Sequence, residues 1–132
     1  MTTSPLHAAL RAGADGLYAL EAGTGLIIAH GTWAERCDSG CFIHYGTGTA
    51  AIDWEAAITA LDAGMLPGSA GEKRMLRLAA SLAGDVPVRL GDAVTGIDQS
   101  NVGLLVKAVF HASGQRRFPG HPIHGQHSGG GS

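Results

Sequence analysis

The chain has 132 residues, of which 45% are hydrophobic and only 5% aromatic, and its formal net charge is −2 at pH 7. This length favours a single domain, and neither the net charge nor the longest apolar run, at 26–29, indicates a nucleic acid or a membrane as partner. The first residues lack a basic region followed by an apolar run, so we expect no secretory signal, reduced thiols on the two cysteines and a cytoplasmic location.

Helix signals begin close to the start of the chain. Pro5 stands at a first helical position, where the amide it lacks would have no partner, and Gly13 ends this helix. Asp15 is a candidate cap for a second helix. The glycines within 23–25 weaken that helix, because each costs about 1 kcal/mol relative to alanine. A break into a short strand over 26–30 is therefore an alternative.

The middle of the chain is less regular. Residues 41–45 alternate with a period of two, which suits a short strand, and 46–49 read as a loop. Asp53 then caps another helix, which Gly64 ends.

The clearest signals lie in residues 69–114, which predict a helix, an extended link, a short helix, a turn and a long helix. Ser69 and Glu72 have the spacing of a capping box, and Gly84 stands where a left-handed residue would end the first of these helices. Asp98 caps the long helix. An apolar stripe with helical spacing follows this cap: Val102, Leu105, Val106, Val109 and Phe110.

Together these signals predict a mainly α fold, a small bundle of five or six helices with at most one or two short strands. We expect one helical domain over 1–118, in which 69–118 resembles a helix-turn-helix unit. Residues 119–132 are rich in Gly, His and Ser and have no apolar period, so a disordered tail is predicted there. The final GGGS has the composition of a linker remnant.

Residues 96–114, GIDQSNVGLLVKAVFHASG, carry a turn, small polar residues, spaced aliphatic residues and a closing glycine. The positions that carry this pattern are Gly96, Ile97, Gln99, Ser100, Asn101, Val102, Val106, Val109 and Gly114. The segment is similar to the turn and recognition helix of winged helix-turn-helix regulators of the ArsR-like and MarR-like families. This resemblance implies a DNA-binding regulator of transcription. Residues 15–118 as a whole also resemble small actinobacterial proteins of unknown function, and that resemblance implies no role.

A DNA-binding site can be assigned on this resemblance. Gln99, Ser100 and Asn101 would project from the first turn of the long helix, where Gln and Asn can pair with adenine, and Lys107 would join them at the groove. Three arginines would hold phosphates: Arg89, Arg116 and Arg117. The charge distribution agrees, because residues 69–132 carry seven Lys and Arg against four Asp and Glu, whereas 1–68 carry two against seven.

Leu104 and Leu105 depart from the family pattern, which usually has polar or basic residues after the buried valine. Exposed leucines would fit a protein partner or a homodimer better than a DNA groove. A helical protein-interaction module that uses Leu104 and Leu105 is therefore the alternative function. Burial of both leucines in the monomer would remove this objection to DNA.

A metal site is a further alternative. Cys37 and Cys41 are spaced C-x3-C, His44 follows three residues later, and His30 lies upstream, so these side chains could form a tetrahedral zinc site. The spacing differs from common zinc signatures, and free cysteines without a cofactor are the preferred interpretation. His30, His44 and His111 could also assist a cysteine nucleophile, but no spacing singles out a pair. A binding protein is thus favoured over an enzyme.

Overall fold

The computed structural model describes residues 5–114 of the chain. These residues form seven α-helices and one two-stranded antiparallel sheet, so the predicted mainly α fold is confirmed. The helix Trp33–Ser39 was not predicted and raises the number of helices above six. Arg116, Arg117 and the tail predicted over 119–132 lie outside the described residues.

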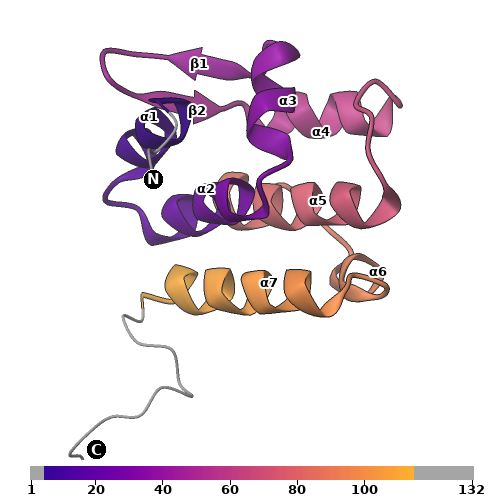
Figure 1. Cartoon of the computed structure of the whole chain (residues 1–132). Coiled ribbons are helices and arrows are strands. Elements are labelled where there is room, and N and C mark those ends of the chain that lie inside the picture. Colours follow the sequence, from indigo (N-terminus) through magenta and orange to yellow (C-terminus); the bar gives the residue numbers. More distant parts are fainter. Residues whose placement is uncertain (1–4, 115–132) are drawn as a thin grey trace, which may run out of the picture.

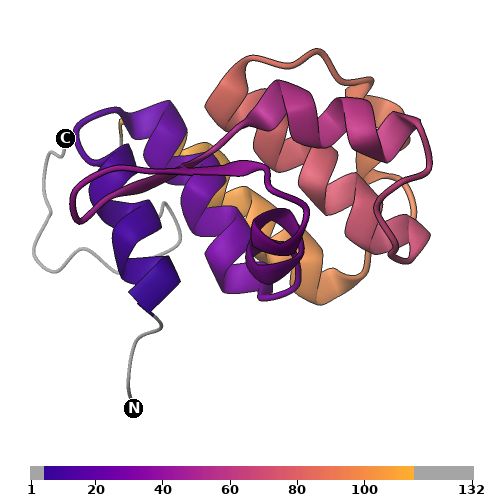
Figure 2. The ribbon, with the colours of Figure 1, turned by 90° about the horizontal axis from the view of Figure 1, so that it is seen from above.

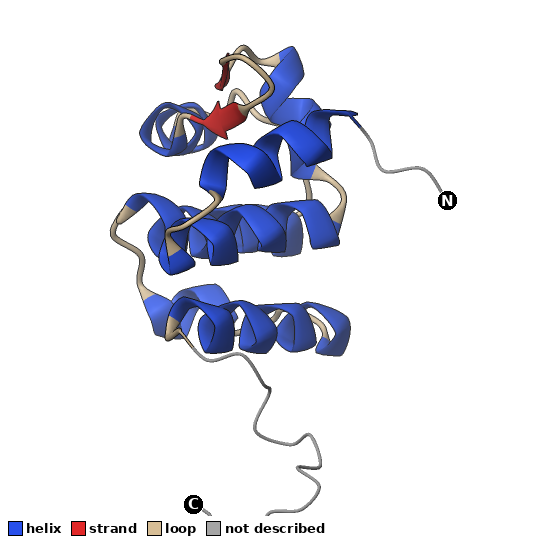
Figure 3. Ribbon diagram, turned by 90° about the vertical axis from the view of Figure 1, so that its left-hand side faces the viewer, coloured by secondary structure: helices blue, strands red, loops and turns tan. Residues whose placement is uncertain are grey.

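The elements stack in three layers, which the side view in Figure 3 separates. One outer layer holds five elements: α1 (Pro5–Ala14), α3 (Trp33–Ser39), β1 (Ile43–Tyr45), β2 (Ala50–Ile52) and α4 (Trp54–Asp62) (Figure 1). The middle layer holds two long helices: α2 (Tyr18–His30) and α5 (Ala70–Gly84). The opposite outer layer holds the last two helices: α6 (Leu90–Val94) and α7 (Gln99–Ala112).

The core forms where α2 and α5 lie side by side, beneath the hairpin and α4 (Figure 2). Its largest fully buried side chains come from four helices: Leu10, Ile27, Trp33, Cys37, Met75 and Leu76. In the hairpin Ile43 is paired with Ile52, and both side chains are buried. The scarcity of aromatic residues agrees with a core made mostly of aliphatic side chains and alanine.

The helix α2 is continuous, so the predicted break into a strand over 26–30 is wrong. A Cβ on Gly23 would lie 2.6 Å from the carbonyl oxygen of Ala79, which means that this glycine allows α2 and α5 to approach closely. The packing gained there outweighs the low helix propensity of glycine. Asp15 is not the cap of α2 either; Leu17 occupies that position without a side-chain hydrogen bond.

Three other predicted caps are confirmed. The side chain of Asp53 accepts a hydrogen bond from the Ala56 amide, and that of Asp98 accepts one from Asn101. Ser69 starts α5 with the complete capping box.

The predicted end of α5 is wrong by one residue. Asp85, with φ of 59°, is the left-handed residue, whereas Gly84 is the last helical one. A Cβ on Gly84 would lie 2.6 Å from the Cβ of Trp54, so this glycine makes room for the indole side chain.

The start of α5 is tied to α3 through Trp33. Its indole Nε1 donates a hydrogen bond to the carbonyl oxygen of Glu72, at 2.7 Å. The Arg36 guanidinium lies over the same indole ring, 5.1 Å from its centroid, and donates to the Glu72 carboxylate at 3.2 Å and to the Pro67 carbonyl at 2.9 Å. Glu72 therefore serves the capping box and this contact at once.

Candidate functional site

The helix α7 forms most of one outer layer and runs antiparallel to α2 along the bottom of the molecule in Figure 1. Its contact with α2 is more extensive than its contact with α5. Leu105 and Ala108 are buried in this contact, and Leu104 and Ala112 are partly buried against the core. The far side of α7 faces away from the rest of the described chain.

The apolar stripe predicted for α7 is wrong in its position around the helix. Of its members Leu105 is buried, but Val102, Val106 and Val109 are 41%, 43% and 51% exposed. The sequence contains two overlapping stripes that share Leu105, and the helix buries the one that includes Ala108. Small alanines allow α7 to lie close to α2, which favours that choice.

Exposed apolar side chains are concentrated on the last two helices. Of the nine large hydrophobic side chains that are exposed within residues 5–114, five lie there: Leu90, Val94, Val102, Val106 and Val109. We call these five residues the α6–α7 apolar surface. The three valines follow one another at i, i+4 and i+7, so they share one side of α7. The helical period of the sequence did single out these valines, but the prediction placed them in the core and not on the surface.

The two leucines on which the protein-interaction prediction rested are not exposed together. Leu105 is 9% exposed, and Leu104 is partly buried against the core. Leu105 thus meets the criterion of burial and Leu104 meets it only in part, so the objection that they raised to DNA binding is weakened. The three valines, rather than the leucines, are the apolar side chains that α7 exposes.

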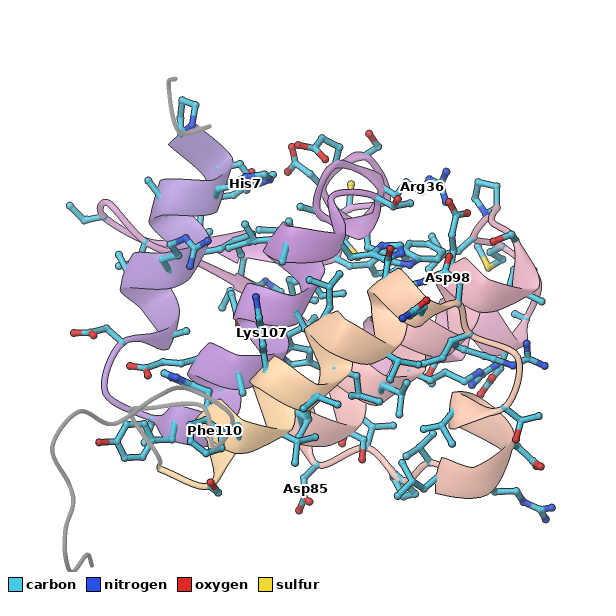
Figure 4. All side chains as sticks on the ribbon, turned by 60° about the horizontal axis from the view of Figure 1, so that its bottom comes forward. His7, Arg36, Asp85, Asp98, Lys107 and Phe110 are labelled. Atoms are coloured by element: carbon cyan, nitrogen blue, oxygen red, sulfur yellow. The ribbon has the colours of Figure 1, made fainter. Side chains whose placement is uncertain are left out.

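The side chains predicted to read a DNA groove are separated along α7. Gln99 and Ser100 are exposed on its first turn, and Asn101 is half-buried. Lys107 lies eight residues beyond Gln99, about 12 Å along the helix axis. Figure 4 shows Lys107 on the flank of α7 that faces α2, away from the first turn, where Asp98 is labelled.

Arg89, which was predicted to hold a phosphate, lines a depression together with two other arginines. Arg74, Arg77 and Arg89 line one depression of about 630 Å³ between α5 and α6. Arg77 is paired with Asp62 at 2.6 Å, whereas Arg74 lies against Gly96 in the turn before α7. Arg74 and Arg77 were missed as site residues, although their i, i+3 spacing off the apolar stripe of α5 could have indicated a basic face.

The predicted zinc ligands form no metal site. Cys37 is fully buried, and burial raises the pKa of its thiol to about 11. Cys41 is exposed, and the Nε2 atom of His44 lies 3.3 Å from an Oδ atom of Asp53. Across residues 5–114, no three or more His, Cys, Asp or Glu side chains are placed to hold a metal ion.

Comparisons of this chain with protein-family models, curated proteins and solved structures found no match. Among the helices of residues 5–114, none has the length and apolar character needed to cross a membrane.

Proposed function

We propose that this chain is a macromolecule-binding protein and that the α6–α7 apolar surface binds a helix of a protein partner. The observation that supports this most strongly is the exposure of Val102, Val106 and Val109 in one row on α7. A row of branched aliphatic side chains at helical spacing is the pattern by which amphipathic helices dock. Contiguous exposed apolar surface is also a general mark of protein-binding sites.

The partner we propose is a second copy of this chain. Within the described residues, α7 carries only two basic side chains, Lys107 and His111, and both line the side of the helix next to α2. The valine row is therefore free of charged side chains, so its recognition depends on apolar packing. A two-fold contact places the same row on both sides, which makes two copies complementary without any further feature.

Sedimentation velocity over a range of protein concentrations tests this proposal. The wild type is expected to form dimers as concentration rises, and Val106→Lys is expected to remain monomeric because the contact would bury an unpaired ammonium. Met65→Lys is the matched control, since Met65 is 71% exposed but lies outside the α6–α7 apolar surface. A wild type that stays monomeric at its highest soluble concentration would overturn self-association.

DNA binding is the second candidate, and a different observation favours it. Gln99 and Ser100 are exposed on the first turn of α7, and Arg74 lies against the turn that leads into that helix. Arg89 lines the same depression as Arg74. Amide side chains next to guanidinium groups are suited to bases and phosphates respectively.

Binding to a pool of random duplex DNA at two salt concentrations tests this second candidate. Affinity that falls steeply with salt, and falls further in Arg74→Ala/Arg89→Ala, is expected if these arginines hold phosphates. Arg11→Ala is the control for removal of a cation elsewhere on the surface, because Arg11 lies on α1, outside the depression that Arg74 and Arg89 line. No binding at low salt, or equal losses in both variants, would contradict it.

A further inference from the structure

We infer that the pocket between α1, α2 and α7 binds a small monovalent organic anion, a carboxylate group on an apolar body. This site is separate from the α6–α7 apolar surface, and the inference does not depend on the proposed self-association.

The pocket has the size and the walls of a small-molecule site. Its volume is about 380 Å³, within the range of pockets that hold such ligands. Leu26 of α2 and Leu104 and Ala108 of α7 form apolar walls. Thr24, the one buried polar or charged residue within 5–114, also lines it. The pocket thus combines apolar walls with few polar groups, as ligand sites generally do.

Gly25 keeps the pocket open. It lines the pocket on α2, and a Cβ built on it would meet no other atom within 4 Å. The neighbouring Gly23, by contrast, is needed for contact with α5. Helix packing therefore accounts for Gly23 but leaves Gly25 unexplained, and a side chain at position 25 would enter the space assigned to the ligand.

Two cations line the pocket from different helices. Arg11 extends from α1 and Lys107 from α7, and neither forms an ion pair or hydrogen bond with the described residues. Figure 4 shows the Lys107 side chain on the side of α7 next to α2. Because the two positive groups belong to separate helices, one ligand anion could contact both.

Two carboxylates, Asp15 and Glu21, also line the pocket and formally equal the two cations in number, but Glu21 has bonding partners of its own. One oxygen of Glu21 accepts a hydrogen bond from the Gly16 amide at 2.8 Å, and the other lies 2.7 Å from Nε2 of His111. Glu21 is thus occupied in holding α7 to α2. Asp15 also lines the pocket and offsets one of the two cations. One of the two cations is then left without a carboxylate partner, and a ligand with a single negative charge would pair with it.

The test uses the whole chain with sodium octanoate as probe and octanamide as its neutral match. In a nitrogen-15 amide titration, octanoate is expected to shift resonances of α2 residues that line the pocket and to bind more tightly than octanamide. Arg11→Gln/Lys107→Gln should weaken octanoate binding by about tenfold or more, because charge-assisted hydrogen bonds are lost.

A second variant tests whether the ligand occupies the pocket, independently of the charges that line it. Gly25→Leu is expected to abolish octanoate binding by filling the pocket. Gly71→Leu is the matched control, since Gly71 is also helical with no atom within 4 Å of a built Cβ, and it lies on α5 outside the pocket. Val106→Lys is expected to bind octanoate normally, which separates this inference from the proposed self-association.

Two results would overturn the inference. Equal affinity for octanoate and octanamide would show that the cations take no part. Unchanged octanoate binding in Gly25→Leu, or shifts confined to Val102, Val106 and Val109, would place the probe outside this pocket.

Discussion

Gly23 of α2 faces Ala83 of α5 so closely that a Cβ on the glycine would overlap the Cβ of Ala83. The same atom would lie 2.6 Å from the carbonyl oxygen of Ala79. The contact between the two middle-layer helices therefore depends on a missing side chain. Two residues further along α2, a Cβ built on Gly25 would meet no other atom within 4 Å.

These two glycines should respond to alanine in opposite ways. Gly23→Ala is expected to lower the free energy of unfolding by about 1–3 kcal/mol, because the helices must move apart. Gly25→Ala is expected to raise it by up to about 1 kcal/mol, since alanine favours a helix and meets no obstacle. Urea unfolding followed by circular dichroism measures both. The same sign for the two variants would contradict the close approach of α2 and α5 at Gly23.

Two adjacent residues of α7 should also differ sharply in how much their side chains contribute to the free energy of unfolding. Leu105 is 9% exposed, so Leu105→Ala is expected to lower the free energy of unfolding by about 2–5 kcal/mol through loss of packing. Val106 is 43% exposed, and Val106→Ala is expected to change it by no more than about 0.5 kcal/mol. Thermal unfolding at a low protein concentration, where the proposed dimer would dissociate, compares the monomers. If Val106→Ala lost more stability than Leu105→Ala, the stripe predicted from the sequence would be the buried one.

Two carboxylates should make stability depend on acid pH. The Ala56 amide, and then the His44 side chain, hold the pKa of Asp53 below its ordinary value. The Ser69 amide, and then a nearby guanidinium, do the same for the pKa of Glu72. For both groups the unfolded chain binds protons more readily than the folded one. Their stabilisation is therefore fully present above the ordinary carboxyl pKa, near about pH 4, and is lost as pH falls through the lowered folded pKa.

The variant Asp53→Asn/Glu72→Gln checks this effect while keeping residues that suit a cap and a capping box. Its melting temperature is expected to fall less steeply than that of the wild type between about pH 5 and pH 3. Parallel curves for the two proteins would show that these carboxylates do not contribute.

The two cysteines should differ in reactivity. Cys41 is exposed and Cys37 is fully buried, with its pKa raised by burial to about 11. A thiol reagent is expected to modify only Cys41 in the folded protein, because Cys37 is protonated and inaccessible. In Cys41→Ser, the remaining thiol should react only after denaturant is added. Rapid reaction of this variant in the folded state would show that Cys37 is accessible.

The sequence predicted local features well because they depend on groups close together in the chain. Asp53, Ser69 and Asp98 each cap a helix by accepting a bond from an amide three residues later. Nothing distant is needed for such a contact. The continuity of α2 at Gly23 and the true end of α5 depend instead on Ala79 and Trp54, which the local pattern cannot reveal.

The candidate sites show the same limit. Exposure of Gln99 and Ser100 follows from their place on the first turn after Asp98, so sequence reasoning could predict it. The orientation of α7 could not be predicted, because the helix carries two apolar stripes. Which of them is buried depends on how each fits the surface of α2. The pocket with Arg11 and Lys107 joins residues 96 positions apart, and no spacing rule connects them.

The docking of α7 onto α2 has a consequence for how this chain could be inherited. Residues 69–114 hold the last three helices in one continuous stretch, but the surface that receives Leu105 and Ala108 belongs to α2, which ends at His30. A recombination event in the linker near Pro67 would separate α7 from α2, the helix against which it packs. The two halves are therefore expected to pass from ancestor to descendant together, and neither is expected to serve as a transplantable module.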